Sequence, residues 1–166
     1  MKYFLHYLII ILFIGSLTSC KEKNISNENN NQIGQNEKMF ITTMQKHLNS
    51  VSNRDLSTLE STMHPNGKMQ LILPGTEIIT GVDGFMEYHK NWFNDSNWTF
   101  ETKILNTEIG DTFGMAITEI VYREPERNGM PYFNRMIVSY DLEKFNGNWY
   151  IIKDHASSIE KSTDKK

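Results

Sequence analysis

Residues 146–158 read Asn-Gly-Asn-Trp-Tyr-Ile-Ile-Lys-Asp-His-Ala-Ser-Ser, and this stretch decides the fold. Asn146 and Gly147 both tolerate a positive φ angle, which makes them the strongest two-residue hairpin signal in the chain. Apolar side chains recur on both sides of this turn. The pattern therefore predicts two long antiparallel strands, 132–145 and 149–158.

A two-residue turn also predicts the register of these strands. Counting outward pairs Lys144 with Trp149 and Val138 with His155, and puts Asp154 on the opposite face from His155. The face that includes His155 carries Val138, Tyr140, Leu142, Trp149, Ile151 and Ser157. Both faces are partly apolar, and helices can cover only one of them. The second face is therefore expected to meet another copy of the chain in a homodimer.

The segments before this hairpin extend the same fold. Alternating apolar residues predict strands at 98–109 and 113–123, and shorter strands at 68–73 and 77–80. Apolar residues at spacings of 3 and 4 predict helices at 37–51 and 82–93, with a shorter helix after Asp55. Helices, short strands, one helix and then a four-strand meander indicate an α+β domain with its helices on one side of an antiparallel sheet.

The first twenty residues have the features of an export signal. Lys2 precedes a continuous apolar core, Leu8–Ile14, which is shorter than the roughly 20 residues that a membrane span needs. The segment ends in Leu17-Thr18-Ser19-Cys20, which resembles a bacterial lipobox, and Lys21-Glu22-Lys23 loosely resembles the export signal of Bacteroidetes surface lipoproteins. The resemblance implies that residues 1–19 are removed and that acyl chains on Cys20 anchor the protein in the cell envelope, at the outer membrane, on its periplasmic or surface side.

Composition sets the remaining boundaries. Residues 20–36 contain the lipidated cysteine and an asparagine-rich tether that is expected to be disordered, and residues 160–166 form a polar tail expected to be disordered. One domain is left at 37–159. A formal net charge of -3 argues against a nucleic-acid partner. The single cysteine and the scattered histidines predict neither a disulfide framework nor a metal site, and no cofactor is expected.

Two motifs resemble a known family. Residues 79–85, Ile-Thr-Gly-Val-Asp-Gly-Phe, open the helix at 82–93, and residues 146–158 end in a Gly-x-Trp-x-Ile-x-x-Asp-His-x-Ser pattern. Together with the element order they resemble the SnoaL-like branch of the nuclear transport factor 2-like superfamily, over residues 37–159. The resemblance implies a curved sheet and N-terminal helices that close a cone-shaped pocket. Enzymes of the superfamily place an acid/base residue in such a pocket, but its members also include binding proteins and oligomerisation domains.

His155 is the candidate acid/base residue, because the predicted register places it among apolar neighbours near the end of the last strand. A histidine held in the core by a backbone carbonyl is the alternative. Further ligand-binding candidates supply aromatic walls or polar contacts: Trp92, Tyr122, Arg135, Tyr140, Trp149 and Ser157. Leu73 stands before Pro74-Gly75, where ketosteroid isomerases of this superfamily carry a catalytic aspartate, which argues against isomerase chemistry of that kind.

Three functions remain open on the sequence. The first is a membrane-anchored lipoprotein whose pocket binds a small, largely apolar ligand without catalysis. The second is a dehydratase, isomerase or cyclase that uses His155 as acid/base. The third is a dimeric interaction module of the envelope. No residue pattern identifies the ligand.

Overall fold

The computed structural model describes residues 19–164, and side chains from residue 34 onward. Helix α2 spans Ser19–Asn53, α3 spans Leu56–Glu60 and α4 spans Val82–Phe93. The predicted signal peptide lies almost wholly outside the described residues. Among the described helices, none combines the length and the apolar character needed to cross a membrane.

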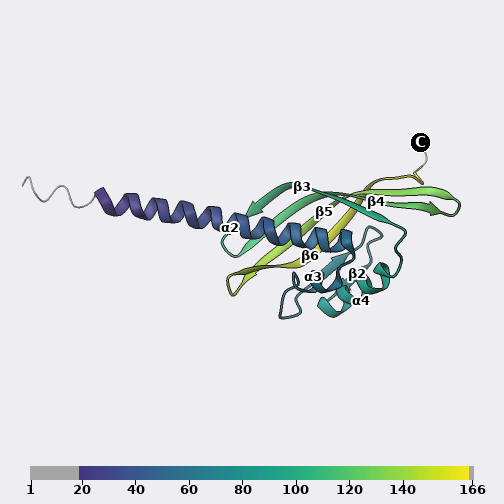
Figure 1. Cartoon of the computed structure of the whole chain (residues 1–166), viewed down its shortest axis with the longest axis horizontal. Coiled ribbons are helices and arrows are strands. Elements are labelled where there is room, and N and C mark those ends of the chain that lie inside the picture. The colour runs from purple at the N-terminus through teal and green to yellow at the C-terminus, as the bar shows by residue number, and fades with distance from the viewer. Residues whose placement is uncertain (1–18, 165–166) are drawn as a thin grey trace, which may run out of the picture. The chain divides into compact units, whose positions relative to one another are not determined.

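The strands form one sheet of six, in the order β2-β1-β6-β5-β4-β3. The four long strands are β3 (Thr99–Ile109), β4 (Phe113–Arg127), β5 (Met130–Phe145) and β6 (Asn148–Lys161), and they follow one another as the predicted antiparallel meander. The short strands β1 (Gln70–Ile72) and β2 (Ile78–Thr80) extend the sheet beyond β6. Figure 1 shows the long strands curving together, with α4 beside β2. This is the α+β architecture that the element order predicts.

The core lies between one face of the sheet and the helices. Phe40, Met44 and Leu48 are buried along α2 at spacings of four residues, as an apolar helical stripe requires. Phe40 meets Trp149 edge to face, with 5.2 Å between ring centroids. The indole of Trp149 therefore ties the last hairpin to α2 inside the core.

Two elements differ from the sequence-based prediction. Helix α2 begins at Ser19 rather than Glu37, so it includes the segment 21–36 that composition predicts to be a flexible tether. Once the packed residues from Met39 onward form a helix, each further residue adds a backbone hydrogen bond at low cost. Strands β4 and β5 are longer than the predicted 113–123 and 132–145: they continue through Pro125 and Pro131 and leave only Asn128 and Gly129 as a tight turn between them.

The hairpin at 146–147 starts in the predicted register and then departs from it. Asn146 and Gly147 have φ angles of 50° and 82°, and Lys144 pairs with Trp149 as expected. Beyond that, Asp141 pairs with Lys153 while Leu142 pairs with Ile151, so Ile152 is an extra residue on β6. Such a β-bulge moves every later side chain of the strand to the other face. The predicted pairing of Val138 with His155 is therefore wrong, because Val138 pairs with Ala156.

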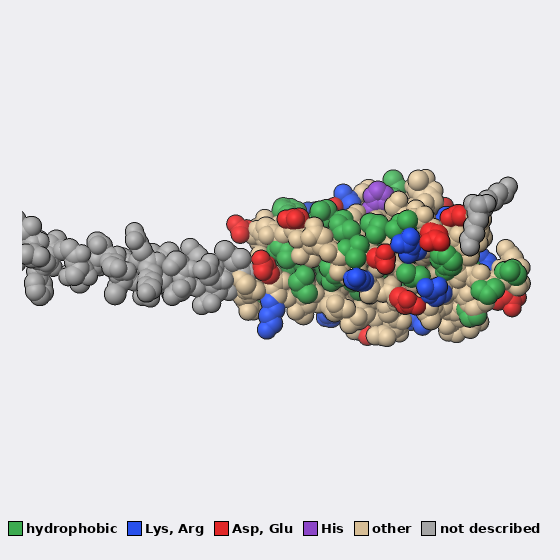
Figure 2. Space-filling view, turned by 90° about the horizontal axis from the view of Figure 1, so that it is seen from above, with side chains coloured by type: hydrophobic (Ala, Val, Ile, Leu, Met, Phe, Trp, Pro, Cys, Tyr) green, Lys and Arg blue, Asp and Glu red, His purple; other side chains and the backbone are tan. Residues whose placement is uncertain are grey.

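The outer face of the sheet, away from the helices, is mixed in character. It carries half-buried apolar side chains, Met115, Ile117, Val121 and Ile137. Charged pairs stand among them, including Lys153 with Asp141 at 3.5 Å. Figure 2 shows the molecule from above relative to Figure 1. In this view, hydrophobic side chains lie scattered between charged ones. The predicted homodimer stays a prediction, and this outer face is the surface that it would bury.

Candidate functional site

A cavity of about 390 Å³ opens between the sheet and α4. Its walls come from the inner faces of β3–β6, from α4 and from the segment around β1. Aromatic and aliphatic side chains dominate: Val51, Leu71, Leu73, Pro74, Tyr88, Trp92, Phe100, Ile120, Tyr122, Tyr132, Met136, Val138, Tyr140 and Ala156. The polar groups in the described lining are the tyrosine hydroxyls, the Trp92 indole N–H and the side chains of His89, Arg127, Asn134 and Asp154. This volume and lining are typical of a site for a small organic molecule.

The cavity is elongated along β5. Asn134 and Tyr140 both line it and lie six residues apart on the same strand, which corresponds to about 20 Å between their backbones. Tyr140 is 2% exposed, and it pairs across the sheet with Asp154. The Tyr140–Asp154 end is therefore the closed, inner end. Asn134 is itself only 8% exposed, but the Arg127 side chain near it is 42% exposed, so the mouth lies at this second end.

Asp154 is the one carboxyl group at the inner end. It is 8% exposed, and its Oδ1 atom is buried without a hydrogen-bond partner among the described residues. Because a buried carboxylate loses its hydration, burial raises the pKa of Asp154 to about 7. Burial is the main cause that raises the pKa of Tyr88 and of Tyr140, and the nearby charge of Asp154 raises both further. The inner end thus holds a carboxyl group that can exchange a proton near neutral pH.

Two buried histidines, His47 on α2 and His89 on α4, are held neutral. Burial lowers the pKa of His89 to about 4, and burial together with the neighbouring His89 lowers the pKa of His47 to about 3. His47 is fully buried against Phe85 and Tyr140, and its Nδ1 lies 2.9 Å from the hydroxyl of Thr62. His89, unlike His47, is part of the cavity wall. Neither imidazole carries charge at neutral pH.

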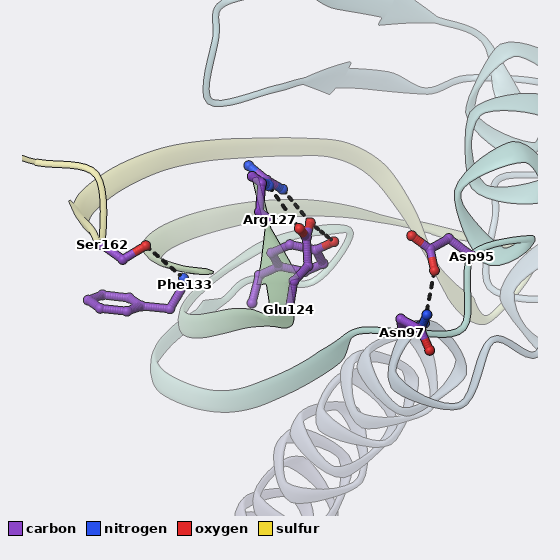
Figure 3. Close-up of polar contacts among 7 residues, drawn as sticks. Asp95, Asn97, Glu124, Arg127, Phe133 and Ser162 are labelled. Carbon is purple, nitrogen blue, oxygen red and sulfur yellow. Dashed lines mark hydrogen bonds and ion pairs between the residues drawn. The ribbon is translucent and has the colours of Figure 1, made fainter. Parts of the chain in front are cut away.

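The mouth is framed by a polar cluster at the β4–β5 turn. The Tyr122 hydroxyl donates to Glu124 at 2.5 Å, and Arg127 Nε donates to the same carboxylate at 2.8 Å (Figure 3). The Arg127 guanidinium also lies 3.5 Å from the ring centroid of Tyr132, which is a cation–π geometry. Arg127 is therefore compensated by Glu124 and fixed at the rim rather than free to pair with a ligand in the interior.

Three of the candidate residues lie in this cavity. Trp92 comes from α4, Tyr122 from β4 and Tyr140 from β5. Trp92 stacks on Trp98 at 4.4 Å, so its ring is held in place by the core behind it. Trp149 is buried against Phe40 and is not among the lining residues.

The other candidates lie on the outer face: His155 and Ser157 because of the bulge at Ile152 on β6, and Arg135 because it alternates with the inward-facing residues of β5. His155 and Ser157 are exposed there, so the predicted position of His155 among apolar core neighbours is wrong. Arg135 also faces outward and pairs with Glu119 and Glu160, at 3.4 Å each. Asp154, which the sequence-based register placed on the opposite face from the pocket, occupies the inward position instead.

Sequence reasoning missed several polar residues of the cavity. Asp154 directly precedes His155, so a shift of one residue in register is all that separates the two candidates. His89 packs in the core and also lines the cavity. His64 is buried and contacts the rings of Phe145 and Tyr150. A run of apolar residues through Ile151 and Ile152 was the only available signal that β6 changes face.

Comparisons with known proteins agree with this fold. The family model of the SnoaL-like domain matches residues 41–160. A hexachlorocyclohexane dehydrochlorinase from Novosphingobium barchaimii is 12% identical, covers 81% of this chain and 92% of its own, and has a TM-score of 0.68. A ketosteroid isomerase-like protein from Erwinia carotovora atroseptica is 14% identical over 74% of this chain and 95% of its own, with a TM-score of 0.62.

A third similar structure has another kind of function. The association domain of calcium/calmodulin-dependent kinase II from C. elegans is 22% identical over 73% of this chain and 94% of its own, with a TM-score of 0.55. No curated protein sequence matches the chain. At these identities the solved structures show the nuclear transport factor 2-like fold and no specific activity. Within the part of the chain that the structure describes, no cluster of His, Cys, Asp and Glu is suited to hold a metal ion.

The buried carboxyl group makes stability depend on pH. Asp154 has a pKa of about 7 in the folded chain and about 3.9 when unfolded, so the folded state binds the proton more tightly. The contribution of Asp154 to the free energy of unfolding should therefore fall by up to about 4 kcal/mol as the pH rises from about 4 to 7. Above pH 7 this contribution should stay constant. Urea unfolding of Asp154→Asn should lack this slope and show a more stable protein at pH 8. Asp141→Asn, on the outer face, is the control; if Asp154→Asn keeps the parent slope, the carboxyl group is not buried as described.

Proposed function

Because the chain belongs to the SnoaL-like domain family, we propose that its cavity binds a small, largely apolar molecule. The observation that carries this proposal is an aromatic and aliphatic cavity with one buried carboxyl group at its closed end. Apolar walls supply affinity through burial of ligand surface. The few polar groups, Asp154 inside and Asn134 at the mouth, would orient the molecule.

Filling the cavity tests this proposal. Ala156→Phe places a ring among Val138, Tyr140 and Asp154, and should weaken binding of the neutral fluorescent probe N-phenyl-1-naphthylamine at least tenfold. Ser157→Phe adds the same ring to the exposed outer face and should leave the dissociation constant unchanged. Fluorescence titration measures both. Equal binding by the parent and by Ala156→Phe would show that the probe does not enter the cavity, and absence of binding by the parent would contradict the proposal.

Proton transfer in the same cavity is the second candidate function. The pKa of about 7 at Asp154 favours it, because general acid/base catalysis is most effective when the pKa lies near the working pH. The carboxylate would take a proton from a bound apolar molecule, and the acid would return it. In this candidate mechanism Asp154 takes the role that the sequence analysis gave to His155.

A generic proton-abstraction substrate distinguishes the two residues. With 5-nitrobenzisoxazole, kcat/KM should rise with pH through about 7, since only the carboxylate form accepts the proton. Asp154→Asn should remove this activity, whereas His155→Ala should retain it. Loss of activity in His155→Ala with retention in Asp154→Asn would reverse the assignment.

We also propose that the domain is anchored by lipid on Cys20, at the outer membrane of a bacterial envelope. Support comes from Leu17-Thr18-Ser19-Cys20, which ends in the only cysteine of the chain. Expressed in a bacterium, the protein should partition into the detergent phase of Triton X-114, with a mass that corresponds to an acylated chain starting at Cys20. Cys20→Ser should stay in the aqueous phase; detergent partitioning by Cys20→Ser would refute the anchor.

A further inference from the structure

Two residues of the cavity wall, Asp154 and His89, carry hydrogen-bond acceptors. Asp154 Oδ1 is one, buried and unpartnered among the described residues. The Nε2 atom of His89 is another, as the hydrogen bond of its Nδ1 atom shows. Its Nδ1 lies 2.8 Å from the backbone carbonyl oxygen of Phe85, and a carbonyl can only accept, so Nδ1 carries the hydrogen. Since the ring is neutral, Nε2 has no hydrogen and can only accept a hydrogen bond.

The same logic fixes His47 behind the wall. The Thr62 hydroxyl donates its hydrogen to the carbonyl of Leu59 at 2.6 Å. His47 Nδ1 must therefore donate to Thr62, which leaves Nε2 as an acceptor, buried and unpartnered among the described residues. Neither imidazole can therefore donate a hydrogen bond into the cavity, and a ligand group that donates is complementary to Asp154 Oδ1 and to His89 Nε2.

The charges of the cavity favour a cationic donor. Asp154 and Arg127 are the only lining residues with side chains that carry a full charge, and Arg127 is paired with Glu124 at the mouth. A buried carboxylate requires a counter-charge, and none of the described lining residues supplies one beside Asp154. An anionic ligand would meet this carboxylate unpaired, and a neutral alcohol would supply a single donor without charge.

The walls favour the same ligand chemistry. Tyr88, Trp92, Phe100 and Tyr122 line the cavity with aromatic rings, and Tyr140 stands directly across from Asp154. Of these rings, Tyr140 and Tyr88 are the ones near the Asp154 carboxylate, because its charge acts on both. Aromatic rings near a carboxylate stabilise a desolvated ammonium group, because the ring faces carry partial negative charge. An apolar body with a protonated amine therefore matches both the walls and the acceptors.

We propose that the ligand of this cavity is an apolar amine, whose ammonium group pairs with the Asp154 carboxylate and donates a hydrogen bond to its Oδ1. This inference rests on the proposed ligand-binding function. A secondary or primary ammonium brings two or three N–H donors as well as the positive charge. The ammonium group replaces the proton on Asp154 as the counter-charge of the carboxylate. The apolar part of the ligand then extends along β5 toward the mouth of the cavity.

Binding should then depend on pH in one direction. Below pH 7 the amine has to displace the Asp154 proton, so its affinity falls by about tenfold per pH unit; above pH 7 it is constant. The facing groups do not change charge between pH 5 and 9: His89 on α4 stays neutral, and Tyr88 and Tyr140 have raised pKa values. Arg127 stays cationic at the mouth, while Lys153 and His155 on β6 face away.

The test uses two probes of the same shape. 4-Phenylpiperidine is cationic over this pH range, and 4-phenylcyclohexanol is its neutral hydroxyl counterpart. Each displaces N-phenyl-1-naphthylamine from the full mature chain in a fluorescence competition. At pH 8 the amine should bind at least tenfold more tightly than the alcohol, and this preference should shrink about tenfold at pH 6. Asp154→Asn should abolish the preference, whereas Asp141→Asn on the outer face should retain it.

The possible failures are separable. If both probes bind and the amine shows no preference, the amine assignment is wrong and the proposed ligand-binding function stands. If the preference survives in Asp154→Asn, Asp154 does not recognise the ammonium group, and the inference is equally overturned. If the parent protein binds neither the probes nor N-phenyl-1-naphthylamine, the proposed function itself fails. Retained binding of N-phenyl-1-naphthylamine by Asp154→Asn shows that the variant still folds around its cavity.

Discussion

The bulge at Ile152 shifts β6 by one residue against β5, and the chemistry of the cavity depends on this shift. Before the bulge, Trp149 and Ile151 face the core; after it, Asp154 and Ala156 do. A regular strand would have turned His155 inward and left Asp154 among the charges of the outer face. The extra residue thus exchanges an imidazole for a carboxyl group in the pocket.

Burial of that carboxyl group opposes folding and supports function. The cavity gives Asp154 no partner for Oδ1, so the folded chain holds a group that would be better solvated when unfolded. The packing of Phe40, Met44 and Leu48 beneath the sheet supplies apolar burial that offsets this cost. A destabilised polar group inside a stable apolar frame is a common property of binding and catalytic sites.

The neutral histidines extend the same arrangement. His47 and His89 are both fixed as acceptors at Nε2, because Thr62 and the Phe85 carbonyl take their Nδ1 hydrogens. Arg127 is kept at the rim by Glu124 and Tyr132. The interior therefore has one titrating group near neutral pH, and a ligand that reaches it meets acceptors rather than cations.

The amino-acid sequence by itself determined the order of the elements, the α+β class and the start of the last hairpin. These depend on local signals: apolar spacing for α4, which spans the predicted residues, and positive φ angles at Asn146-Gly147. The aromatic wall residues Trp92, Tyr122 and Tyr140 could be predicted from the same local signals, because none of them lies on the bulged strand β6. Only the tertiary structure decided which of Asp154 and His155 faces the cavity. The bulge lies where β6 pairs with β5 on one side and, from Lys153 onward, with β1 on the other, and apart from the apolar run Ile151-Ile152 the sequence has no local signal for it.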